Sequence, residues 1–206
     1  MSEASRQLSD EERAELKQQL TSKSASLRAE TVGFKVRGQE MADGAVVAQT
    51  PTSLTDAELS VCGVKGFMID EVRKFHREDG SSKEVDCASV AALDIIDSPV
   101  HVHGVTQEMY EILEGEGKMV LGKEVADVKK GSVVVLPPGI EHGLASNDPN
   151  TPVKVLLSFT PGIAPKTEPE FRDEAIVYER TSERIQQLLG SVRQSISDID
   201  DSLVNT

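Results

Sequence analysis

Short stretches rich in valine, isoleucine and leucine recur through the middle of this chain. They cover residues 59–64, 67–73, 87–95, 108–113, 118–121, 132–136 and 153–159. Turn-forming clusters, such as residues 78–82, separate them, and no helical periodicity lies between them. Many short strands joined by frequent turns favour a β-sandwich or barrel over alternating strands and helices. The pattern therefore predicts a mainly β domain over residues 45–162.

The start of the chain carries a helical pattern instead. Ser9 and Glu12 have the spacing of a capping box, in which each side chain accepts a hydrogen bond from the other residue's backbone N–H. We therefore expect a helix from this point to about Ser22, with Leu16 and Leu20 as its small apolar face. So short a helix needs a surface to pack against, because helix propensity alone seldom stabilises it.

The end of the chain carries a second helical pattern. Apolar residues spaced alternately four and three apart form one stripe: Ile185, Leu189, Val192, Ile196, Ile199 and Leu203. This spacing predicts an amphipathic helix that covers the β domain or a dimer interface. The expected organisation is thus an N-terminal helical or extended arm over 1–44, the β domain over 45–162, and a linker with a C-terminal helix over 163–206.

The charge balance narrows the classes of partner. The 206 residues include 22 Lys and Arg against 35 Asp and Glu, for a formal net charge of −13. A nucleic-acid binder needs a concentrated basic face, and so does a protein that adsorbs to anionic membranes. No signal-peptide-like or bilayer-length apolar run occurs, and Cys62 and Cys87 are too few for a disulfide framework. We expect a cytoplasmic protein without a nucleic-acid or membrane partner.

Three of the four histidines fall in two short segments of the β region. His101 and His103 are two residues apart, so on a strand they present both imidazoles to one face. Glu108 follows a four-residue insert and begins another strand, and His142 follows the Pro137-Pro138-Gly139 turn. Three imidazoles and one carboxylate would suit Fe, Mn, Ni, Co, Cu or Zn better than Ca, which prefers oxygen ligands.

These segments resemble the two signature motifs of the cupin superfamily. The first is His101-x-His103-x4-Glu108-x6-Gly115, and the second is Gly131-x5-Pro137-x-Gly139-x2-His142. The resemblance implies a small β-barrel or jelly roll, here flanked by N-terminal and C-terminal helices. It also implies one divalent transition metal ion held by His101, His103, Glu108 and His142. The family's glycine six residues before the first histidine is Ile95 here, and its asparagine four residues after the last is Ser146.

Strand alternation sorts the neighbouring side chains. Tyr110 shares a face with Glu108, so it either lines the pocket or packs in the core. Glu111 lies on the opposite face and is therefore a poorer ligand candidate than Glu108. Glu141 points away from His142, which predicts that its side chain is exposed to solvent.

The resemblance leaves the reaction open, because cupin proteins include enzymes of many kinds as well as binding proteins. We expect a metal-dependent enzyme that acts on a small polar molecule, of dioxygenase or sugar isomerase/epimerase type. An isomerase needs a general base, for which Tyr110 and Glu108 are the catalytic candidates beside His142. A dioxygenase needs only a redox-active metal and an open position. The alternative is a non-catalytic small-molecule binding or sensor protein, and for either we expect a homodimer.

Overall fold

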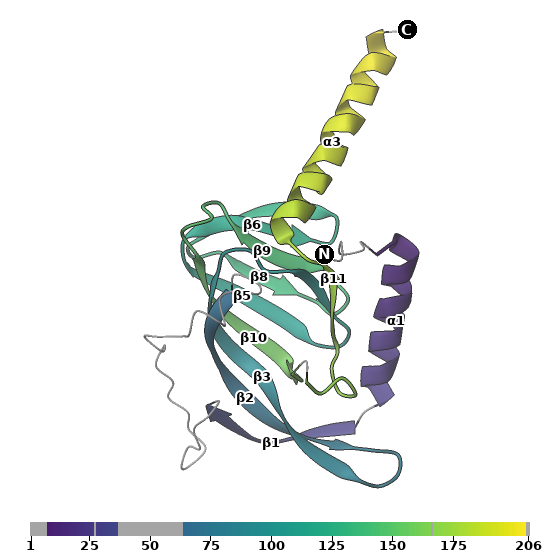
Figure 1. The fold of residues 1–206 in the computed structure, drawn as a ribbon, viewed down its shortest axis with the longest axis vertical. Coiled ribbons are helices and arrows are strands. Elements are labelled where there is room, and N and C mark those ends of the chain that lie inside the picture. Colours follow the sequence, from purple (N-terminus) through teal and green to yellow (C-terminus); the bar gives the residue numbers. More distant parts are fainter. Residues whose placement is uncertain (1–7, 27, 37–63, 166, 205–206) are drawn as a thin grey trace, which may run out of the picture.

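A computed structural model describes residues 8–26, 28–36, 64–165 and 167–204 of the chain. In these residues two antiparallel β-sheets form the body of the protein, one helix near the start lies beside them, and a second near the end projects away from them (Figure 1). The protein is therefore mainly β, as its sequence pattern predicts.

The larger sheet contains six strands. In spatial order they are β1 (Arg28–Val36), β2 (Val64–His76), β3 (Ser82–Ile95), β10 (Val153–Ile163), β5 (Gln107–Glu114) and β8 (Val133–Leu136). The late strand β10 pairs with both β3 and β5, so segments distant in sequence lie side by side.

The smaller sheet contains five strands. In spatial order they are β11 (Glu174–Tyr178), β4 (Val100–His103), β9 (His142–Ser146), β6 (Glu116–Leu121) and β7 (Glu124–Lys129). Strands β4 and β5 are consecutive in sequence but belong to different sheets. Such crossings between two antiparallel sheets are typical of the jelly roll that the sequence indicates.

Most apolar stretches of the sequence form strands in the structure. The stretches at 67–73, 87–95, 108–113, 118–121 and 153–159 lie wholly within strands, and β8 takes in 133–136. The stretch at 59–64 lies outside the described residues except for its last position. Residues 28–36 form the edge strand β1, along which Val32, Phe34 and Val36 alternate with other residues. The division of the chain at residues 44 and 162 stays a prediction.

The main hydrophobic core lies around β5, β6 and β10. Its most deeply buried side chains include Ile95, Tyr110, Ile112, Met119 and Leu144. A second cluster, which contains Val100, Val102 and Ile185, receives Leu16 and Leu20 of the first helix. The small apolar face predicted for that helix therefore packs against the five-stranded sheet.

The first helix, α1 (Asp10–Ser26), begins at the predicted capping box. Glu12 accepts a hydrogen bond from the Ser9 backbone N–H at 2.7 Å, and the Ser9 hydroxyl accepts one from the Glu12 N–H at 3.2 Å. The two contacts satisfy backbone donors that a helix start otherwise leaves free.

The second helix, α3 (Thr181–Val204), is anchored only at its beginning. Thr181 donates to the Ser98 carbonyl from its backbone N–H and from its hydroxyl, and Ile185 is buried. Further along, Leu189, Val192 and Ile196 are exposed, and the helix projects away from the sheets (Figure 1). Neither helix, in the part of the chain that the structure describes, is long and apolar enough to cross a membrane.

Candidate metal centre

The four residues singled out in the sequence meet between the two sheets. Strand β4 carries His101 and His103, and His142, the first residue of β9, pairs directly with His101. All three histidines thus belong to the five-stranded sheet. Glu108 stands on β5 of the six-stranded sheet and completes the cluster from the facing side.

The side chains converge on one oxygen atom. Glu108 Oε2 lies 2.7 Å from His142 Nε2, 3.1 Å from His103 Nε2 and 3.7 Å from His101 Nε2. The four potential ligand atoms all lie within 4.8 Å of one another. Three of the side chains are about 2% exposed, whereas that of His101 is 12% exposed. His101 is therefore the most exposed of the four side chains.

Backbone carbonyls orient two of the imidazole rings. The Nδ1 atom of His101 lies 3.0 Å from the Pro99 carbonyl, and that of His142 lies 2.8 Å from the Ile140 carbonyl. A carbonyl oxygen only accepts hydrogen bonds, so each Nδ1 must donate. In the neutral ring the Nε2 atom then carries the lone pair, and it faces the cluster.

This arrangement fits a bound cation. The neutral His142 ring offers its Nε2 lone pair to the Glu108 carboxylate only 2.7 Å away, and two acceptors this close need a positive charge between them, either a proton or a metal ion. Ligands about 2.1 Å from a common ion lie at most about 4.2 Å apart. The cluster, with its 4.8 Å maximum, reaches that size after shifts of a few tenths of an ångström. The donor set and its dimensions thus suit a transition metal.

Charge favours the same conclusion. Burial raises the pKa of Glu108, but the surrounding histidines outweigh burial and hold that pKa well below its ordinary value. Burial lowers the pKa of His101, yet the Glu108 carboxylate overcomes this effect and raises the pKa to about 9. Burial, together with the charge of His101, lowers the pKa of His142. Glu108 is thus ionised and His142 neutral, as metal binding requires, whereas His101 carries a proton at neutral pH that it must release when a metal ion binds.

A tight turn holds the two histidine-bearing strands in register. Gly139 adopts a φ of +85°, which side chains other than glycine rarely tolerate, and its N–H donates to the His103 carbonyl at 2.7 Å. Gly143, next to His142, lies so close to α3 that an added Cβ would meet Thr181 Oγ1 at 2.1 Å. The backbone at both positions therefore fixes where His142 stands.

Asp173 supports the centre, although sequence reasoning does not identify it. Its buried carboxylate accepts hydrogen bonds from the backbone N–H groups of Thr106 (2.8 Å) and Val105 (3.2 Å), in the loop between β4 and β5. Its other oxygen lies 3.9 Å from His103 Nδ1, a buried atom without a hydrogen-bond partner among the described residues. Asp173 is distant in sequence and lies in no motif, so no local signal marks it.

Tyr110 and Glu111, which follow Glu108 on β5, lie on opposite faces of the strand. Tyr110 faces the same side as Glu108, with its ring 6.1 Å from that of His142, but it is 2% exposed and packs in the main core. Glu111 is half-buried on the opposite face of β5, as expected.

Glu141 does point away from His142, but the expectation that it is exposed is wrong. Helix α1 covers that face, and Glu141 is buried beside Lys17 at 3.1 Å and Arg13 at 3.9 Å. Alternation along the strand gives the direction of its side chain correctly but does not reveal the helix that lies there.

Comparison with known proteins gives one family and several partial likenesses. Residues 97–159 match the family described as Cupin domain. An uncharacterized protein of Methanocaldococcus jannaschii is 40% identical over 62 residues, which are 30% of this chain and 49% of that protein. The chain thus spans about half the length of that curated relative.

Two solved structures are similar to part of this chain. One is an uncharacterized protein with a double-stranded β-helix domain from Klebsiella pneumoniae, 21% identical, with a TM-score of 0.34 over 43% of this chain and 74% of that one. The other is an RmlC-like cupin protein from Desulfovibrio desulfuricans, 29% identical, with a TM-score of 0.30 over 34% and 68% of the two chains.

Proposed function

We propose that residues 97–159, which match the family described as Cupin domain, belong to a domain that binds one divalent transition metal ion per chain and presents it to a small polar molecule. The ligands are His101, His103, Glu108 and His142. The observation that carries the proposal is the convergence of three imidazole Nε2 atoms on one buried carboxylate oxygen, with two of the rings oriented by hydrogen bonds from Nδ1 to backbone carbonyls.

The ligand set restricts the choice of metal. Three imidazoles and one carboxylate suit Fe, Mn, Ni, Co, Cu or Zn, and a site with oxygen ligands alone would suit Ca. When bound, such an ion polarises carbonyl or hydroxyl oxygens, and Fe, Mn or Cu also supports chemistry with dioxygen. Because four protein ligands do not fill an octahedral shell, the partly exposed His101 side leaves room for a small molecule.

Metal content tests the site directly. We expect the wild-type protein, purified without added metal, to carry close to one transition-metal ion per chain by elemental analysis. The variant His101→Ala/His103→Ala should lose it, because only two ligands remain. His76→Ala is the matched control, since His76 is exposed at the end of β2 and contacts Glu30 rather than the cluster. Equal metal content in all three proteins would overturn the assignment.

A dioxygenase-type reaction fits the site better than an isomerase-type reaction does. An isomerase needs a base that reaches the substrate proton. Glu108 and His142 are engaged on the metal in this proposal, and Tyr110 packs in the core rather than along open space. A dioxygenase makes no such demand, because the metal with its open position carries the chemistry.

Activity assays separate this reaction class from its alternatives. With a panel of small polar metabolites, oxygen uptake that depends on the metal and on His101 would support the dioxygenase proposal. Isomerisation under anaerobic conditions would favour the isomerase type. Metal-dependent ligand binding without turnover would favour the sensor or binding protein. The last two outcomes leave the metal site intact and overturn only the reaction class.

We further propose a homodimer formed through α3. The exposed Leu189, Val192 and Ile196 continue the stripe whose first member, Ile185, is buried, and their four-three spacing is that of paired helices. Light scattering coupled to size exclusion should show a dimer at micromolar concentration. Val192→Glu/Ile196→Glu should give monomers, whereas the control Ser191→Glu/Gln194→Glu, away from the stripe, should not. A monomeric wild-type protein would refute the proposal.

The acidic charge of the chain also bears on nucleic-acid and membrane partners. With a net charge of −13, the protein is proposed to act without a nucleic-acid or membrane partner, in the cytoplasm. Retention on immobilised DNA at physiological salt would contradict the first part.

A further inference from the structure

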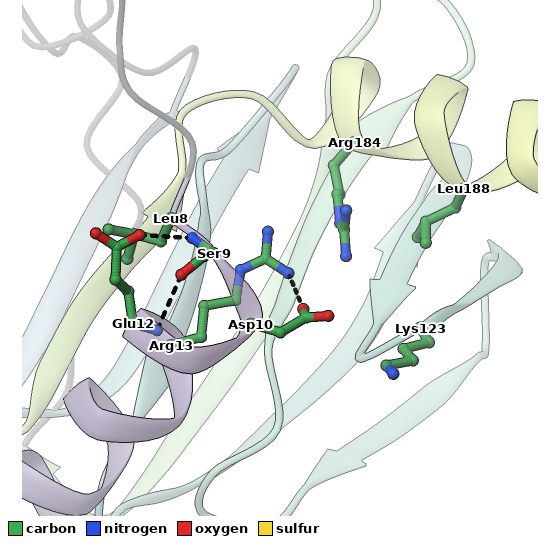
Figure 2. Close-up of a pocket in the computed structure, with 8 residues that line it drawn as sticks. All are labelled: Leu8, Ser9, Asp10, Glu12, Arg13, Lys123, Arg184 and Leu188. Atoms are coloured by element: carbon green, nitrogen blue, oxygen red, sulfur yellow. Dashed lines mark hydrogen bonds and ion pairs between the residues drawn. The ribbon is translucent and has the colours of Figure 1, made fainter.

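A cleft lies on the outer side of the five-stranded sheet, away from the metal ligands. It opens between the start of α1, the turn that joins β6 to β7, and the first turns of α3 (Figure 2). Its volume is about 610 Å³, and an adjoining hollow of about 300 Å³ shares several of its residues. Leu8 and Leu188 supply apolar wall. This volume is in the range of small-molecule sites.

Basic side chains from three separate elements line this cleft. Arg13 comes from α1, Lys123 from the β6–β7 turn, and Arg184 from α3 (Figure 2). The adjoining hollow adds Lys17, but that lysine already pairs with Glu141 at 3.1 Å. The three shared basic residues lie far apart in sequence, so only the tertiary fold brings them together.

Some hydrogen-bond donors and charges of these side chains have no partner among the described residues. The Arg13 side chain is only 8% exposed, and its Nη1 lies 3.4 Å from Asp10 and 3.9 Å from Glu141, so its charge is paired, but its Nε has no hydrogen-bond partner among the described residues. Neither Lys123 nor Arg184 forms an ion pair within the part of the chain that the structure describes, and Arg184 reaches only Gln187, at 3.5 Å. Two unpaired cations thus face one cleft of a protein whose net charge is −13.

We propose that this cleft binds the phosphate group of a phosphate monoester. Lys123 and Arg184 are its charged ligands, the Arg13 Nε–H is a further hydrogen-bond donor, and Leu8 and Leu188 contact the organic part of the molecule. The lining carboxylates of Asp10 and Glu12 favour a ligand whose phosphate lies toward Lys123 and Arg184. A dianionic phosphate matches two unpaired cations, and the planar arginine fork suits phosphate oxygens. Because Glu141 separates this side of the sheet from His142, the site is independent of the proposed metal function.

Calorimetric titration with glycerol 3-phosphate at low ionic strength tests the proposal. We expect saturable binding to the wild-type chain and a Kd at least about tenfold higher for Lys123→Gln/Arg184→Gln, which loses both charged ligands. The control Lys130→Gln/Arg193→Gln removes the same charge from exposed positions outside the cleft and should bind like the wild type. Thermal unfolding of each variant checks that it remains folded.

A second arm identifies the source of the phosphate. Co-sedimentation with phosphatidic acid vesicles, beside phosphatidylcholine vesicles, tests whether a lipid headgroup occupies the cleft. Binding in either arm that is lost in Lys123→Gln/Arg184→Gln and kept in the control supports the site and names its source. No binding of the wild-type chain in both arms, or equal binding by all three proteins, would overturn it.

Discussion

Replacing Asp173 tests whether a residue that does not bind the metal ion nevertheless strengthens metal binding through His103. The Asp173 carboxylate is not one of the four proposed metal ligands. It accepts hydrogen bonds from the loop between β4 and β5, and it faces the Nδ1 side of the His103 ring. Asparagine keeps the shape and one oxygen atom. If that oxygen continues to accept from the Val105 and Thr106 N–H groups, an NH₂ donor faces His103 Nδ1 in place of an acceptor. The ring then faces a donor in place of a negative charge, which no longer favours a proton on Nδ1 and the metal-binding lone pair on Nε2.

The expected magnitudes differ between two variants. Loss of a group that orients a metal-bound histidine weakens metal affinity about 10- to 100-fold, or about 1.4–2.7 kcal/mol, and we expect this for Asp173→Asn. Asp173→Ala also removes the acceptor of two backbone N–H groups. At about 1.5 kcal/mol for each bond to a charged acceptor, the free energy of unfolding should fall by about 3 kcal/mol.

Two measurements and one control decide the matter. Metal affinity is measured by competition with a chelator of known affinity, and stability by urea unfolding of the metal-free protein. Asp127→Asn is the control, because Asp127 is exposed and pairs with Lys118 on the far side of β6 and β7. An Asp173→Asn protein that binds metal as tightly as the wild type would refute the reasoning about His103.

Two further predictions concern the packing of the fold. Gly143→Ala should lower the free energy of unfolding by more than about 1 kcal/mol, because the new Cβ would lie 2.1 Å from Thr181 Oγ1 and force the start of α3 away. Urea unfolding measures this change, and an unchanged midpoint would contradict the close contact. In a Cys62→Ser variant, Cys87 should resist a thiol reagent at pH 8 until the protein unfolds. Burial raises its pKa to about 12, so almost no thiolate exists at that pH, and rapid reaction of the native protein would show that the thiol is accessible.

The local parts of this structure follow closely from the sequence. The capping box places the start of α1, because its two hydrogen bonds involve residues only three apart. Strand alternation puts His101 and His103 on one face, and Glu108 with Tyr110 on another, because successive side chains on a strand point to opposite sides. The resemblance to the cupin motifs then pairs the two segments, and the structure brings their four residues together.

Only the tertiary structure decides what lies opposite each of these faces. Periodicity gives the direction in which Glu141 points, but its burial depends on Arg13 and Lys17, which reach it from a helix more than 120 positions earlier. The support of His103 by Asp173 likewise joins residues 70 positions apart. The sequence by itself thus determined most strands between residues 64 and 163, the helix start and the ligand candidates, which depend on local geometry. Burial, charge compensation and the cleft depend on contacts between distant segments, which no local pattern encodes.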